Sequence, residues 1–175
     1  MITIISGTNR KNSNSAKVAR LYQNLIKEKG LASQVLDLAE LSSDFVSNMY
    51  SNHTQEVEQV IQNYVSDIKH FVFVIPEYNG SFTGAIKLFM DGISPKYFNH
   101  KSAMLVGVAS GRAGNIVGLS QFTTVLNHVK VEVFSNKVLL SGIDGLLDES
   151  GKMTNDNQLK IIENQIDTYK SIHGL

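Results

Sequence analysis

The stretch MITIISGTNRKNSNSAKVAR, residues 1–20, contains the change of pattern that decides the fold. Residues 2–5 are apolar or β-branched, which is typical of a buried strand. An amphipathic helical pattern begins after residue 15. The loop between them, residues 6–15, carries a glycine, an arginine and many hydroxyl and amide side chains. This order of strand, polar loop and helix predicts the first half of a βαβ unit.

Short apolar runs alternate with helical patterns along the rest of the chain. After Ile2–Ile5, strands are predicted over Val35–Leu38, Phe71–Ile75, Ala103–Val108 and, less regularly, Val131–Leu140. The spacing of apolar residues predicts helices over residues 18–26, 54–68, 122–129 and 159–169, with a further helix around residues 87–91. Strands that alternate with helices indicate a parallel sheet covered by helices on both faces. The pattern fits a flavodoxin-like, doubly wound α/β fold with five strands in the order 2-1-3-4-5.

Length and composition narrow the class of protein. The 175 residues suit a single domain spanning residues 1–175, and 16 basic residues balance 16 acidic ones. That balance favours neither a nucleic acid nor an anionic membrane as a partner. The absence of cysteine excludes disulfides and a cysteine nucleophile, and the five histidines show no metal-ligand spacing, so we predict no metal site. No apolar run approaches the roughly 20 residues that span a bilayer, and we expect a cytoplasmic protein.

Three loops that follow predicted strands share glycine, hydroxyl and amide side chains. They are SGTNRKNSNS (residues 6–15), PEYNGSFTG (76–84) and ASGRAGN (109–115). In open α/β sheets, ligands bind outside the carboxyl ends of the strands, where loops of this kind gather. We therefore expect the three loops to form one binding site.

The first of these loops suits a phosphate group. Its hydroxyl and amide side chains can donate hydrogen bonds, and Arg10 can add a charge-assisted one. The helix that follows presents free N–H groups and a partial positive charge. The loop is neither a Walker A sequence nor a G-x-G-x-x-G fingerprint, and its single glycine suits a terminal phosphate held mainly by side chains. An ordinary Ser/Asn-rich helix cap beside a solvated arginine explains the same residues.

The second and third loops suit a flat ring. The pair Asn79-Gly80 predicts a turn with exposed N–H groups, and Tyr78 can pack against an aromatic face. Residues 110–115 form a Gly-rich stretch that a ligand can approach closely. A plain Asn-Gly turn with a surface tyrosine, and a flexible strand-to-helix connection, are the alternative interpretations.

Taken together, the three loops resemble the motifs of the NADPH-dependent FMN reductase family of flavodoxin-like flavoproteins. The family pattern G-S-x-R-x-x-S-x-N stands here as GTNRKNSNS, residues 7–15. The pattern P-E-Y-N followed by a leucine and a lysine stands as PEYNGSFTGAIK, with Ile86 for the leucine. Thr8 stands where serine is usual and Ser15 where asparagine is usual, and the resemblance extends over nearly the whole chain.

The resemblance implies a cofactor and its contacts. The FMN phosphate is expected to lie against Thr8, Arg10, Ser13, Asn14 and Ser15. The ribityl chain and the ring are expected to lie against Pro76, Glu77, Tyr78, Asn79 and Gly80. The other side of the ring is expected to be bordered by Ser110, Gly111 and Gly114. Family members are usually homodimers or homotetramers with the flavin near a subunit interface, so the same assembly is expected here.

The resemblance also implies an enzyme. NADPH or NADH would pass hydride to FMN, and a small acceptor such as a quinone, an azo compound or free flavin would then take the electrons in a ping-pong sequence. No side chain is predicted to be catalytic. A flavodoxin-type electron carrier is one alternative, but such carriers are usually strongly acidic, and the zero net charge and Arg10 argue against it. A nucleotide- or phosphate-binding module without a redox role is the other alternative, and a colourless preparation would favour it.

Overall fold

The fold is built on a parallel sheet. The computed structural model describes residues 1–42, 45 and 54–175. Its strands are β1 (Ile2–Ser6), β2 (Ser33–Asp37), β3 (His70–Pro76), β4 (Ser102–Ala109), β5 (Glu132–Val133) and β6 (Val138–Ser141). They lie in the order β2-β1-β3-β4-β5, with β6 also paired to β4, and every pairing is parallel. The predicted strand order and fold class are confirmed.

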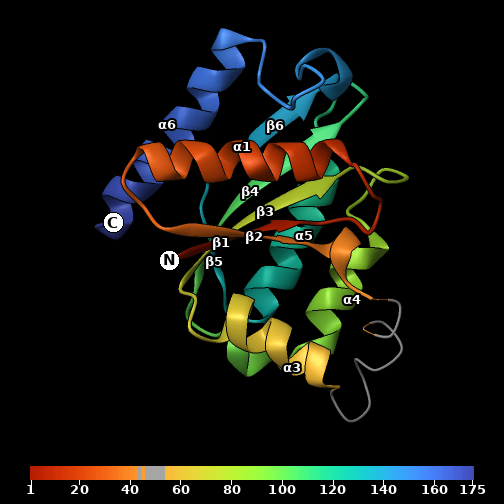
Figure 1. Cartoon of the computed structure of the whole chain (residues 1–175), viewed down its shortest axis with the longest axis vertical. Coiled ribbons are helices and arrows are strands. Elements are labelled where there is room, and N and C mark those ends of the chain that lie inside the picture. The colour runs from red at the N-terminus through yellow and green to blue at the C-terminus, as the bar shows by residue number, and fades with distance from the viewer. Residues whose placement is uncertain (43–44, 46–53) are drawn as a thin grey trace.

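Helices cover both faces of this sheet (Figure 1). The α-helices are α1 (Asn14–Glu28), α3 (Gln55–Ile61), α4 (Gly84–Gly92), α5 (Ile116–His128) and α6 (Asp156–His173). The remaining helical turns are η1 (Leu38–Glu40), η2 (Gln62–Ser66, a π-helical turn), η3 (Pro95–Tyr97) and η4 (Ile143–Gly145). Helices α1 and α6 pack on one face, while α3, α4 and α5 pack on the other. Within the described chain, no helix combines the length and the apolar character that a membrane span requires.

The segment predicted as one irregular strand over Val131–Leu140 is two short strands. β5 pairs with the beginning of β4 and β6 pairs with its end. Between them the chain leaves the sheet, and the carbonyl of Asn136 accepts a hydrogen bond of 2.7 Å from Gln165 Nε2 on α6. A backbone carbonyl that leaves a sheet needs another partner when it is buried, and Gln165 supplies it. This interruption explains why the apolar pattern of the segment is irregular.

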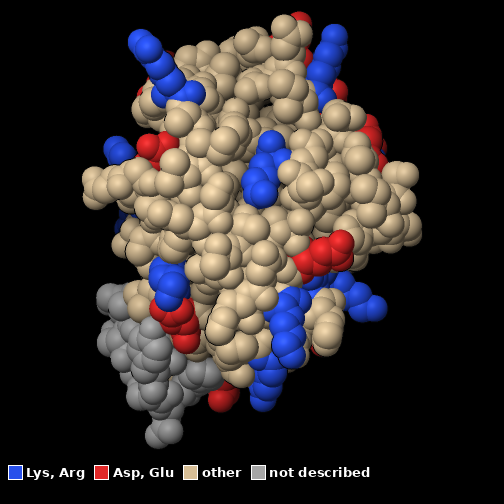
Figure 2. All heavy atoms as spheres, turned by 180° about the vertical axis from the view of Figure 1, so that it is seen from behind, with Lys and Arg blue, Asp and Glu red and all other residues tan. Residues whose placement is uncertain are grey.

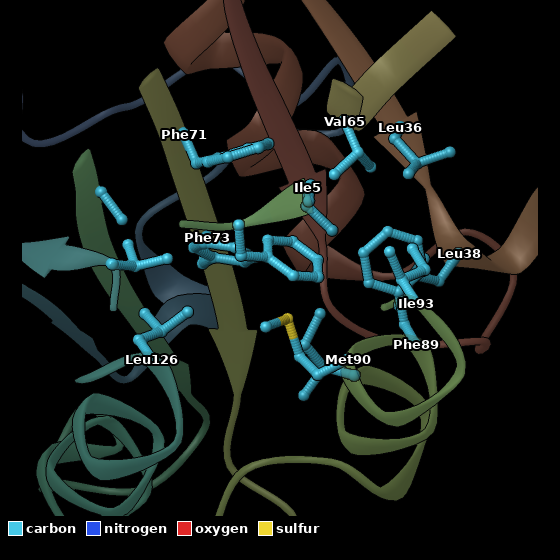
Figure 3. Packing of buried hydrophobic residues seen from close by; sticks show 14 of the residues in the cluster. Ile5, Leu36, Leu38, Val65, Phe71, Phe73, Phe89, Met90, Ile93 and Leu126 are labelled. Atoms are coloured by element: carbon cyan, nitrogen blue, oxygen red, sulfur yellow. The ribbon is translucent and has the colours of Figure 1, made fainter. Parts of the chain in front are cut away.

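The core is densest around β3. Phe71, Phe73 and the residues between and after them up to Ile75 are all fully buried, as expected for a strand covered on both faces. Figure 3 shows Phe73 beside Ile5 of β1, with Met90 of α4 packed nearby. The rings of Phe71 and Phe73 lie with their centroids 5.6 Å apart. Burying each such side chain contributes about 1.5–3 kcal/mol, so the carboxyl ends of the central strands are firmly placed.

Charge is spread over the surface. On the face seen in Figure 2, lysines and arginines stand among acidic residues and are separated by uncharged surface. This distribution agrees with the balance of 16 basic and 16 acidic residues in the sequence.

Candidate cofactor-binding site

A cavity of about 560 Å³ lies where the three predicted loops meet, at the carboxyl ends of the central strands. This volume falls within the about 300–1,000 Å³ that is typical of small-molecule and cofactor sites. The cavity is lined by Arg10, Lys11, Asn12, Ser13, Asn14, Ser15, Pro76, Glu77, Tyr78, Val108, Ala109, Ser110, Ile143 and Asp144. Eight of the thirteen residues predicted to contact a cofactor are therefore in its wall: Arg10, Ser13, Asn14, Ser15, Pro76, Glu77, Tyr78 and Ser110.

The amino end of α1 forms one end of the cavity. Ser13 caps the helix, because its Oγ accepts the N–H of Ala16 at 3.1 Å. Ser15, in the first turn, is 1% exposed, and its Oγ has no hydrogen-bond partner among the described residues. Buried hydroxyls are nearly always paired in native proteins. An unpaired hydroxyl in the wall of a cavity therefore points to a ligand that supplies the missing partner.

The charges at this end favour an anion. The first turn of α1 contains no acidic residue, so the positive end of its dipole is not compensated by the helix itself. Arg10 and Lys11 add two cationic side chains from the loop. Of the two carboxylates in the wall, Glu77 and Asp144, Asp144 accepts a hydrogen bond of 2.9 Å from Asn14 Nδ2. This bond fixes the amide of Asn14 and leaves its second N–H able to donate.

Thr8 occupies a different place from the rest of its loop. It is fully buried, and the cavity wall, as far as the described residues form it, does not include its side chain. Its Oγ1 lies 2.9 Å from the hydroxyl of Tyr78 and accepts the backbone N–H of Arg10 at 3.2 Å. Thr8 therefore links its own loop, at Arg10, to the loop after β3, at Tyr78.

The predicted turn at Asn79-Gly80 is present. Tyr78 and Ser81 exchange two backbone hydrogen bonds of 3.0 and 3.1 Å, and the two residues between them have φ values of +52° and +77°. Positive φ at both central positions is the pattern of a type I′ turn, which Asn-Gly favours. Asn79 and Gly80 form the tip of this turn, next to the cavity wall.

The third loop contributes Ala109 and Ser110 to the wall, whereas its glycines serve packing. Gly114 has a φ of +56°, and a Cβ there would lie 2.7 Å from Cβ of Leu139 on β6. The carbonyl of Gly111 accepts the N–H of Gly142 at 3.0 Å. These contacts hold the loop against the chain around β6. A role of Gly111 and Gly114 beside a ring stays a prediction.

The structure also adds wall residues that were not predicted, namely Lys11, Asn12, Val108, Ala109, Ile143 and Asp144. Ile143 and Asp144 belong to η4, directly after β6. Their position follows from the parallel pairing of β6 with β4, which brings its carboxyl end to the same edge of the sheet. A sequence prediction with a separate strand ending at residue 141 would have placed Ile143 and Asp144 at the cavity.

A metal centre finds no support in the part of the chain that is described. Within residues 1–42, 45 and 54–175, no three histidine or carboxylate side chains gather as a metal-binding group. His53, one of the five scattered histidines, lies outside the described residues.

Comparisons with known proteins point to one family. The model of the family described as NADPH-dependent FMN reductase matches residues 1–144. An NADPH azoreductase of Bacillus sp. (strain OY1-2) is 26% identical over 174 residues, covering 98% of this chain and 95% of that protein. An FMN-dependent NADPH-azoreductase of Staphylococcus aureus (strain USA300) is 27% identical over 139 residues, covering 75% and 68% of the two chains.

Solved structures show the same fold. FerB, an NAD(P)H:(acceptor) oxidoreductase from Paracoccus denitrificans, superposes with a TM-score of 0.79 at 19% identity, covering 96% of this chain and 93% of that one. The apo form of an NADH:FMN oxidoreductase, EMOB, gives a TM-score of 0.76 at 19% identity, covering 97% and 87%. A flavodoxin from the domain Archaea gives 0.58 at 11% identity, covering 99% of each chain.

Proposed function

Because the chain belongs to the family of NADPH-dependent FMN reductases, we propose that it binds FMN in the cavity at the amino end of α1 and reduces a small acceptor with NADPH or NADH. The family model covers residues 1–144, which include all three loops of the cavity. We also propose that residues 1–175 act as one FMN-binding domain. Two relatives are named as NADPH-dependent azoreductases, which supports an azo compound or another aromatic molecule as the acceptor.

The residues present fit the phosphate of FMN. The single observation that carries the proposal is the hydroxyl of Ser15, a residue of the cavity wall, which is enclosed and unpaired within the described structure. A phosphate oxygen accepts hydrogen bonds, and a hydroxyl, an uncompensated helix terminus and an arginine are the donors that phosphate sites in proteins use. The donor set at this end of the cavity thus matches the chemistry of the group.

Each side chain at the phosphate end keeps a donor for the ligand. The Oγ of Ser13 accepts the N–H of Ala16, so its own O–H remains able to donate. One N–H of the Asn14 amide is held by Asp144, and the other can donate. Arg10 supplies charge-assisted hydrogen bonds from the loop. These groups would bind and orient the phosphate without moving the helix.

The other end of the cavity would hold the ribityl chain and the ring. Pro76, Glu77 and Tyr78 leave the end of β3, and the N–H of Glu77 donates to the carbonyl of Val108 at 2.8 Å, which ties this loop to β4. Asn79 and Gly80 form the adjoining turn, whose N–H groups would stabilise negative charge on a ring. When bound, FMN supplies the redox chemistry, because it accepts hydride from a nicotinamide and passes electrons to the acceptor.

We propose that donor and acceptor use the same face of the site in turn. Tyr78, at the rim of the cavity, is 37% exposed, which leaves room for a second planar molecule beside it. Two substrates that share one place cannot bind together, so initial rates should follow ping-pong kinetics. We further propose a cytoplasmic homodimer or homotetramer. Ile116 and Val117, at the start of α5, are 50% and 54% exposed, and these apolar side chains support contact with another copy.

The test begins with the visible spectrum of the purified protein after incubation with FMN and gel filtration. The proposal predicts a yellow protein that NADPH or NADH bleaches rapidly without oxygen, and parallel double-reciprocal plots with an azo dye as acceptor. A yellow protein that ignores both donors would identify an electron carrier. A protein that stays colourless would leave only a phosphate-binding module, and intersecting plots would reject the shared site.

A further inference from the structure

Thr8 and Tyr78 join two loops that are far apart in the sequence. Their hydroxyl oxygens lie 2.9 Å apart across 70 positions of the chain. Thr8 belongs to the loop that begins α1, and Tyr78 to the loop after β3. The same Thr8 oxygen accepts the backbone N–H of Arg10 at 3.2 Å. One hydroxyl thus connects the backbone at the phosphate end of the cavity to the aromatic side chain at its other end.

The surroundings of Thr8 do not suit direct contact with a ligand. Its relative exposure is 0%, whereas Arg10 and Tyr78, its two partners, both line the cavity. A threonine hydroxyl has one donor and two acceptor positions, and two of these three are already occupied. A phosphate in the cavity would therefore contact Arg10, which is in the wall, and not Thr8, which is not.

We propose that Thr8 is a positioning residue rather than a phosphate ligand, and that its hydrogen bond with Tyr78 holds the side chain of Tyr78 in place beside the flavin ring. This inference rests on the proposed function, because it assigns the two ends of the cavity to the two ends of FMN. A second connection supports it. Thr83, which caps α4, donates its hydroxyl to the carbonyl of Gly7, so the same two loops are also joined on the other side of Thr8. The backbone is therefore fixed there, and the Thr8–Tyr78 bond fixes the side chain that faces the cavity.

The test compares two ligands, FMN and riboflavin, which differ only in the phosphate. Their dissociation constants are measured by quenching of flavin fluorescence. Thr8→Val keeps the shape of the side chain and removes its hydroxyl, and Tyr78→Phe removes the other half of the bond. Tyr78→Phe should weaken the binding of both flavins by the same factor of about two to ten, the effect of one neutral hydrogen bond. Thr8→Val, which also removes the acceptor of the Arg10 N–H, should weaken the binding of both at least as much. Thr8→Ser should restore the wild-type affinity.

Two further variants separate positioning from phosphate binding. The double variant Thr8→Val/Tyr78→Phe should bind both flavins no more weakly than Thr8→Val alone, because Thr8→Val has already removed the bond that Tyr78→Phe removes. Arg10→Ala keeps its backbone N–H and loses the cation. It should therefore weaken the binding of FMN and leave the affinity for riboflavin unchanged. If Thr8→Val gives the pattern of Arg10→Ala, Thr8 is a phosphate ligand and the inference is wrong. Independent effects in the double variant would also contradict it.

A failure of the proposed function would look different. If the wild-type protein bound neither flavin, the function would be refuted, and the bond would be tested in the ligand-free protein by urea unfolding. There the losses of stability in Thr8→Val and Tyr78→Phe should be less than additive in the double variant, while additive losses would reject the bond.

Discussion

Ser15 occupies the first turn of α1 with its hydroxyl enclosed and, within the described residues, unpaired. Leaving a buried hydroxyl without a partner costs about 1–3 kcal/mol. A ligand that accepts a hydrogen bond from Ser15 removes this cost and gains a bond to a charged group. The Ser15 hydroxyl should therefore lower the stability of the ligand-free protein and raise its affinity for the ligand.

The substitution Ser15→Ala should separate these two effects, because they have opposite signs. The free energy of unfolding of the ligand-free protein should rise by about 1 kcal/mol, since alanine leaves no unpaired hydroxyl. The affinity for FMN should fall about tenfold, equivalent to about 1.5 kcal/mol, through the loss of a hydrogen bond to phosphate. Urea unfolding and calorimetric titration measure the two quantities.

Ser33 provides the matched control. Its Oγ is also unpaired in the described structure, but it lies at the beginning of β2, at the opposite edge of the sheet from the cavity. Ser33→Ala should leave the affinity for FMN unchanged. A Ser15→Ala protein that bound FMN like the wild type would remove Ser15 from the phosphate site.

The residue types in the loops could be predicted from the sequence, but their partners could not. The motif placed hydroxyls at both Thr8 and Ser15, and the structure gives Thr8 a protein partner but, among the described residues, gives none to Ser15. This difference depends on which way Thr8 turns after β1 and Ser15 turns in α1, and on where the hydroxyl of Tyr78 lies in another loop. The spacing of residues in the sequence predicts neither the direction of these side chains nor the position of the Tyr78 hydroxyl.

At the scale of elements, α5 supports the loop after β3. Gly118, in its first turns, lies so close to this loop that a Cβ would be 2.6 Å from the backbone nitrogen of Phe82 and 2.7 Å from the carbonyl carbon of Ser81. Asn115, just before α5, donates from Nδ2 to the carbonyl of Ile75 at 3.0 Å. The helix thus fixes the chain on both sides of the Asn79-Gly80 turn.

Gly118→Ala should therefore act on the cavity from a distance. The added methyl group must push α5 or the loop away, which should lower the free energy of unfolding by about 1–3 kcal/mol and weaken FMN binding. Gly84→Ala is the control, because a Cβ at the start of α4 meets open space, and it should stabilise by about 0.4–1 kcal/mol. Chemical unfolding measures the free energy of unfolding of both variants. Equal values would contradict the close contact between Gly118 and the loop after β3.

A second element contact joins the end of α6 to the beginning of β3. His70 Nδ1 lies 3.0 Å from the hydroxyl of Tyr169, and the ring of His173 lies 5.4 Å from that of His70. Burial lowers the pKa of His70, and the nearby His173, the amino terminus and Lys69 lower it further. Burial also raises the pKa of Tyr169, so its hydroxyl stays protonated and can donate to His70.

This contact predicts a dependence of stability on pH. Because the folded pKa of His70 lies below its ordinary value of 6.5, the unfolded chain takes up the proton first as the pH falls. The free energy of unfolding should be highest above pH 6.5 and should decrease below it, until the folded pKa is reached. Urea unfolding between pH 5 and 7.5 should show this slope reduced in His70→Gln. An identical slope in the variant would show that other groups cause it.

Helices and strands differ in how far their sequences predict them. The continuous apolar run Phe71–Ile75 is buried on both faces, so its interpretation as a central strand is confirmed. The segment over residues 131–140 is two strands, because a polar interruption there is paired by Gln165 from a distant helix. The helix predicted over residues 54–68 ends in the π-helical turn η2, where Lys101 Nζ donates to the carbonyls of Val65 and Ser66.

At the scale of the whole molecule, two hydrophobic clusters sandwich one parallel sheet. One lies under α3, α4 and α5, and the other lies under α1 and α6. The alternation of strands and helices was enough to predict this layering and the strand order, because short parallel connections allow few topologies. It also predicted where three loops would meet, since the carboxyl ends of parallel strands share one edge. That η4 also lines the cavity at this edge could not be predicted from the alternation and was found in the structure.

The central claim is that FMN lies in this cavity with its phosphate at the amino end of α1. The most direct measurement is a crystal structure of the protein grown with FMN. The phosphate should lie within hydrogen-bond distance of Ser15 Oγ and the guanidinium of Arg10, with the ring beside Tyr78. Flavin density at another place, or a phosphate that leaves Ser15 unpaired, would contradict the claim.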